Sequence, residues 1–306
     1  MRRIPLVFGA VVLITLIAPS PSVATFPGGD GRIAFGDFAG RQIFSIQPDG
    51  TGRMKLTHTA RRVNSQPSWS ADGSQIVFVR QTANFHESEL VVMDADGADP
   101  TSILTSPFRK DYVTFLRPVW SPDGTQIAFC AAPRRGQAKI FVLQADGTNP
   151  VKLSRGAHSD CSPDWSPTGD IAFINFEGRN DSLLTMNADG SNREVLVRTG
   201  ASLHPSWSAD GDSIAVERRL LDEQRNDIWV VGADGTGLRQ LTDTPRRWEF
   251  TPAYSPEGGE IAFVRGRGPR ILDPGDIWLM QPDGSMQTQI TDKPSPDEYV
   301  LSWQPL

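Results

Sequence analysis

The sequence has little of what most enzyme sites require. Its 306 residues include only two cysteines and four histidines. It also lacks the Gly-x-Ser-x-Gly turn that holds the nucleophile of many hydrolases. Hydrolase chemistry requires a nucleophile, a base and a group that orients the base. The residues therefore give no support for a serine hydrolase.

An excess of positive charge is missing as well. The chain has 30 Lys and Arg against 36 Asp and Glu, a formal net charge of −6, and no basic run of the kind that binds nucleic acid. This balance argues against DNA or RNA as a partner.

A long membrane-spanning run is also absent. The longest apolar run, residues 4–18, is shorter than the ~20 residues that cross a bilayer. Arg2 and Arg3 precede it, and small residues follow up to Ala24, which predicts a signal peptide over residues 1–24. The alternative is a retained membrane anchor. We expect a secreted or periplasmic protein, without stable membrane insertion after cleavage.

What the sequence does contain is an internal repeat. Each copy has a Trp or Tyr, a Ser-x-x-Gly turn and a short apolar strand, as in Trp120 to Phe129, and an Asp-Gly turn further on, as at Asp146-Gly147. Neighbouring Asp-Gly turns lie 43 to 50 residues apart. Glycine accepts the positive φ that these turns need. A period in the forties with four strands per unit is typical of a β-propeller blade.

The two ends of the chain complement each other. The first copy begins at residues 31–35 without a Trp-Ser strand, and residues 300–305 supply such a strand without a blade after it. The sequence therefore predicts an all-β, six-bladed propeller of four-stranded antiparallel blades. The C-terminal strand would complete the N-terminal blade and so close the ring.

The repeat resembles that of TolB-type, WD-like propellers. Its form is Pro-x-Trp-Ser-Pro-Asp-Gly-x-x-Ile-Ala-Phe, then an Ile-Trp-Val-Met-like strand, an Asp-Gly turn and a Leu-Thr pair, and it covers residues 25–306 nearly throughout. The resemblance implies one propeller domain over these residues, an exported location and a binding function. TolB itself carries an additional N-terminal α/β domain, which this sequence does not show.

Loops that lead from each Leu-Thr strand to the next Pro-x-Trp strand concentrate Arg, His and aromatic residues. In a propeller they meet around one mouth of the central channel. We expect this mouth to bind a protein or peptide, or an acidic ligand, by charge-assisted hydrogen bonds. The alternative is a set of variable loops that keep the protein soluble. The candidate residues are Arg62, Arg109, His158, His204, Arg247 and Trp248.

Other functions remain open at this point. His58, His158 and His204 lie in channel-facing loops, so a metal-assisted lyase or hydrolase acting on a saccharide is one alternative, and a structural envelope protein is another. We expect a monomeric, non-catalytic binding module without a cofactor. Cys130 and Cys161 fall on neighbouring blades and either form a disulfide, as export permits, or remain buried thiols.

Overall fold

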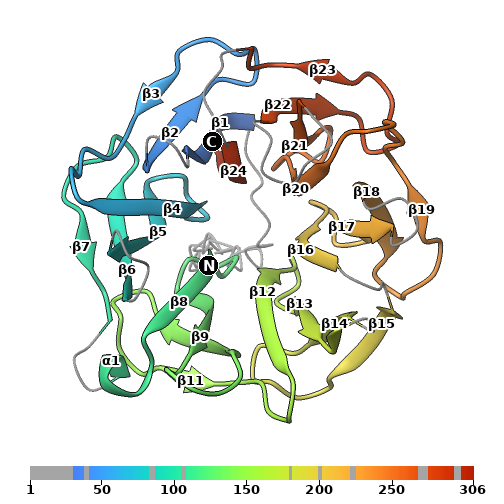
Figure 1. Cartoon of the computed structure of the whole chain (residues 1–306). Helices are drawn as coiled ribbons and strands as arrows, with labels where there is room; N and C mark the ends of the chain where they lie inside the picture. The colour runs from blue at the N-terminus through green and yellow to red at the C-terminus, as the bar shows by residue number, and fades with distance from the viewer. Residues whose placement is uncertain are drawn as a thin grey trace, which may run out of the picture.

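The computed structural model describes residues 30–37, 41–82, 87–104, 108–178, 181–198, 202–220, 225–267, 275–292 and 298–306. The predicted signal peptide lies outside them. The described residues form six four-stranded antiparallel sheets, arranged as blades around a central axis (Figure 1). The predicted six-bladed propeller is therefore confirmed. Within the described residues, no helix has both the length and the apolar character needed to cross a membrane.

The strands fall into four classes by their place in a blade. Innermost are β4 (Arg62–Trp69), β8 (Thr114–Trp120), β12 (Ser159–Trp165), β16 (Ser202–Trp207), β20 (Glu249–Tyr254) and β24 (Glu298–Pro305). Next are β1 (Asp30–Asp37), β5 (Gln75–Thr82), β9 (Gln126–Ala132), β13 (Ile171–Phe176), β17 (Ser213–Leu220) and β21 (Ile261–Gly266).

The third strands are β2 (Gln42–Ile46), β6 (Ser88–Asp94), β10 (Lys139–Gln144), β14 (Ser182–Met186), β18 (Arg225–Gly232) and β22 (Gly275–Met280). The outermost are β3 (Met54–Lys55), β7 (Thr101–Ser102), β11 (Val151–Lys152), β15 (Glu194–Arg198), β19 (Arg239–Gln240) and β23 (Thr288–Gln289). A single turn of helix, α1 (Phe108–Asp111), precedes β8.

The ring closes through the C-terminal strand. β24 pairs antiparallel with β1, with Ile33 opposite Trp303 and Ala34 opposite Ser302, and the sheet order is β24-β1-β2-β3. The two ends of the chain thus share one blade, as the sequence predicted. The first blade therefore has the same four strands as the other five, and the C-terminal strand joins the two ends of the ring.

Asp-Gly turns join neighbouring blades as well as neighbouring strands. The glycine of each turn has a φ between +79° and +90° and packs on a backbone carbonyl of the preceding blade's outer strand or the residues beside it. A Cβ added at Gly147 would lie 1.8 Å from the Ile103 oxygen. Glycine is therefore required for two reasons at this position: its backbone conformation and the close approach of the preceding blade.

The hydrophobic core is divided among the junctions between blades. Six buried clusters each combine residues of two neighbouring blades, and the repeated tryptophans Trp69, Trp120, Trp165, Trp207 and Trp303 lie in them, each with at most 8% of its surface exposed. These tryptophans act in packing. A disulfide between Cys130 of β9 and Cys161 of β12 adds a covalent link between the third and fourth blades, with 5.1 Å between the Cα atoms.

Candidate functional site

The innermost strands enclose a narrow axial cavity, and each strand carries a bulge at the same level. The register of every strand shifts at a residue with positive φ. A bulge of this kind re-aims a side chain, and here all six residues line the cavity. We call them the throat ring: Gln66, Arg117, Ser162, His204, Thr251 and Val300.

A second ring lies two residues further along each innermost strand. Its polar members connect neighbouring strands: Asp164 Oδ2 accepts a 2.8 Å hydrogen bond from the Trp207 N–H, and Ser302 Oγ accepts one from the Trp69 N–H at 3.1 Å. Together the rings bound a cavity of about 130 Å³. This volume has room for roughly four water molecules or for one side chain.

Arg117, His204 and Glu217 form the charged part of the throat. His204 Nδ1 lies 2.7 Å from Glu217 Oε2, which also accepts the Thr251 N–H at 3.2 Å, and Asn226 donates to Glu217 Oε1 at 2.7 Å. Burial lowers the pKa of His204; the Arg117 charge lowers it further, while Glu217 opposes both. Arg117 and His204 come from blades separated by a third, so their charges interact across the cavity.

Burial also perturbs the pKa of two further lining groups. It lowers the pKa of Arg117 to about 10, against the favourable charge of Glu217. It raises the pKa of Asp164 to about 7, although the N–H groups of Trp207 and Trp165 stabilise the carboxylate. Near neutral pH the throat therefore holds a cation, and the second ring holds a carboxyl that is close to its midpoint.

The predicted mouth residues sit on the face from which the innermost strands start. Arg62 begins β4, Arg109 lies in α1 before β8, and His158 directly precedes β12; all three are exposed. Arg109 Nη1 lies 3.5 Å from Glu89 Oε2. Burial lowers the pKa of Arg80, as does the nearby charge of Arg62, while Glu89 raises it. Arg80 and Arg109 thus share the carboxylate of Glu89.

Three other predicted residues lie elsewhere. His204 is within β16, in the throat and below the mouth. Arg247 is half-buried and donates from Nη1 to the Gly266 oxygen at 3.1 Å. Trp248 is only 7% exposed and packs in the cluster that joins the sixth blade to the first. We therefore leave Trp248 out of the candidate binding surface.

The three histidines considered for a metal site have different surroundings. His58 and His158 are exposed, whereas His204 uses Nδ1 to bind Glu217. Among the described residues, no group of three or more His, Cys, Asp or Glu side chains is arranged to hold a metal ion.

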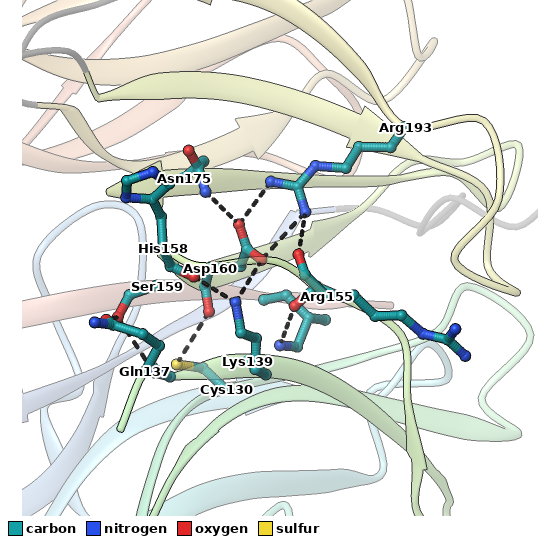
Figure 2. Close-up of polar contacts among 12 residues, drawn as sticks. Cys130, Gln137, Lys139, Arg155, His158, Ser159, Asp160, Asn175 and Arg193 are labelled. Carbon is teal, nitrogen blue, oxygen red and sulfur yellow. Dashed lines mark hydrogen bonds and ion pairs between the residues drawn. The ribbon is translucent and has the colours of Figure 1, made fainter. Parts of the chain in front are cut away.

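A buried carboxylate beside the mouth was missed in the sequence. Asp160 is fully buried at the start of β12, where its Oδ1 accepts hydrogen bonds from Asn175 and Arg193 at 2.7 and 2.8 Å (Figure 2). Lys139 Nζ lies 3.5 Å from Oδ2 and also donates to the His158 oxygen. Since Lys139 and Asp160 belong to different blades, this network fixes the loop that carries His158.

Comparison with known proteins supports the same architecture. The chain is 37% identical over 170 residues to a protein TolB homolog from Chlorobium luteolum, covering 55% of this chain and 38% of that protein. Among solved structures, TolB from Acinetobacter baumannii superposes with a TM-score of 0.73 at 17% identity over 90% of this chain and 67% of that one.

A putative TolB from Agrobacterium tumefaciens superposes with a TM-score of 0.68 at 19% identity, covering 91% of this chain and 92% of that one. The match to the Chlorobium relative spans well under half of that protein's length. The family described as "TolB beta propeller domain" matches residues 131–293, more than half of the chain. The repeats, the closed six-bladed ring and this match agree, and the chain belongs to the TolB β-propeller domain family.

Proposed function

We propose that this protein is an exported, non-catalytic binding module that takes an acidic segment of a protein partner at the mouth of its channel. The observation that carries the proposal is a pair of exposed cations on the face from which the innermost strands start: Arg62 begins the innermost strand β4, and Arg109 lies in α1, nearer the outer edge of the disc (Figure 1). In an otherwise acidic chain, this placement favours a ligand of negative charge. One relative is described as the Tol-Pal system protein TolB of Thioalkalivibrio sulfidiphilus, which is consistent with a partner and a location in the cell envelope.

The size of the cavity supports a surface interaction. A space of about 130 Å³ admits one side chain and is well below the several hundred Å³ of a typical small-molecule site. A partner would therefore lie over the mouth, with the loops as its contact surface. Loops on a rigid scaffold commonly serve this purpose.

The test uses a fluorescent peptide of alternating Glu and Gly, with a Gln-Gly peptide as the neutral control. The double variant Arg62→Gln/Arg109→Gln removes the exposed cations, and Lys152→Gln on the outermost strand β11 is the matched control. Two exposed ion pairs predict a loss of roughly twofold to thirtyfold in affinity, with a marked salt dependence. Equal binding by wild type and the double variant would refute the proposal and favour a structural envelope role.

The alternative of a metal-assisted enzyme has a separate test. Elemental analysis of the purified protein, with thermal melts in the presence and absence of a chelator, measures whether a metal is bound. Stoichiometric metal together with a melting temperature lowered by chelation would favour the enzyme and direct attention to His58, His158 and His204.

A further inference from the structure

Arg117 is the one throat residue whose charged group has no direct partner within the described part of the chain. It lies in β8 with a φ of +54°, lines the cavity, and makes no side-chain hydrogen bond or ion pair with any described residue. Glu217 influences it only at longer range. Arg117 is half-buried, and a cation partly removed from water without a direct partner is costly. Such a cost indicates a site prepared for a ligand that supplies the missing negative charge.

A second group in the same ring is also without a partner. The Thr251 hydroxyl is buried and makes no hydrogen bond with the described residues, although Thr251 lines the cavity. Buried hydroxyls are usually satisfied. The throat thus combines an unpartnered cation with an unpartnered hydroxyl, which are the donors that a carboxylate accepts.

Neighbouring acids do not fill this role. Glu217 is already held by His204, Asn226 and the Thr251 N–H. Asp164 lies in the second ring, where it accepts the Trp207 N–H. The negative charge that complements Arg117 is therefore left for a ligand.

We propose that the throat holds a single carboxylate, paired with the Arg117 guanidinium and hydrogen-bonded to the Thr251 hydroxyl. This inference rests on the proposed function, because the acidic segment bound at the mouth delivers the carboxylate. The cavity volume limits the inserted group to one acidic side chain or one chain end. The cations at the mouth would then attract acidic segments in general. The throat would select those segments that carry a carboxylate at the correct position.

Small probes test the throat independently of the mouth. N-acetyl-glutamate α-methylamide offers a side-chain carboxylate, N-acetyl-glycine a chain-end carboxylate, and N-acetyl-glutamine α-methylamide a neutral control of equal size. Binding is followed through the NMR signals of His204 in a buffer without carboxylates. Arg117 lowers the pKa of His204, so neutralising Arg117 with a bound carboxylate should raise it.

We expect at least one of the two carboxylates to bind, to raise the pKa of His204, and to lose roughly tenfold to hundredfold in affinity in Arg117→Gln. Lys152→Gln on the outermost strand β11 should bind the probes as wild type does, and Arg117→Lys should retain part of the affinity. Equal titration by the neutral amide, or full affinity in Arg117→Gln, would overturn the proposal. If Arg117→Gln fails to fold, the wild-type comparison of acid with amide decides the question. If the mouth variant loses peptide binding but the wild type binds no carboxylate probe, the throat inference is refuted and the proposed function is not.

Discussion

The Cys130–Cys161 disulfide makes a quantitative prediction about stability. It closes a loop of 31 residues and ties β9 to β12 across a junction between blades. Loop-closure entropy for that length is about 3.7 kcal/mol at 25 °C. Reduction should therefore lower the free energy of unfolding by about 3 to 4 kcal/mol, because the reduced unfolded chain gains conformational freedom.

Urea denaturation followed by tryptophan fluorescence measures this difference. Oxidised and fully reduced protein are compared, so that both samples have the same side chains. The variant Cys130→Ala/Cys161→Ala is the control, and its unfolding midpoint should not respond to reductant. Identical midpoints for the oxidised and reduced wild type, or two alkylatable thiols in the oxidised protein, would refute the reasoning.

Three further predictions concern the turns and the buried charges. Gly147→Ala should destabilise the fold by roughly 1–3 kcal/mol more than Gly237→Ala in chemical denaturation, because both have positive φ but only Gly147 meets a neighbouring blade; equal losses would contradict the inter-blade role. Burial raises the pKa of Asp164 to about 7. As pH rises from about 4 to 7, the carboxyl ionises in the unfolded chain but not in the folded one, so the free energy of unfolding of the wild type falls. Asp164→Asn should therefore gain stability relative to wild type over that window, by up to about 1.4 kcal/mol per pH unit, and a constant difference across pH would count against it. Arg117→Gln should raise the pKa of His204 in the free protein, measured by NMR, since the Arg117 charge lowers it. An unchanged pKa would show that the Arg117 charge does not act on His204.

The fold was accessible from the sequence because its determinants are local and repeated. A Ser-x-Asp-Gly turn is specified by short-range bonds such as Ser121 Oγ to Asp123 Oδ1 at 2.6 Å, and these bonds leave a sequence pattern. Ring closure followed from a strand missing at one end and present at the other. The sequence showed only one of the two reasons for the Asp-Gly glycines, since the approach of the preceding blade to Gly147 depends on tertiary packing.

The throat was less accessible because its geometry depends on bulges. A bulge gives Arg117 and His204 a positive φ and directs them into the cavity, whereas a regular strand would alternate its side chains. One signal was present. In five repeats a residue of varied chemistry directly precedes the proline of the inner strand: Gln66, Arg117, Ser162, His204 and Thr251.

Buried networks such as that of Asp160 left no such signal. Its partners are Lys139 on β10, Asn175 on β13 and Arg193 just before β15, all distant in sequence, and Lys139 belongs to the neighbouring blade. Charged residues at strand ends usually face water. Only the packed blades show that this carboxylate is fully buried and fully paired.

Site-specific photocrosslinking in the producing organism tests the central claim most directly. A crosslinking amino acid replaces Arg62 or His158, which lie at the starts of the innermost strands β4 and β12, or Lys55 or Lys152 on the outer rim, all four of which are exposed. The account predicts that both mouth positions capture the same partner protein and that the rim positions do not. Capture from the rim with no product from the mouth would contradict the placement of the binding surface at the channel.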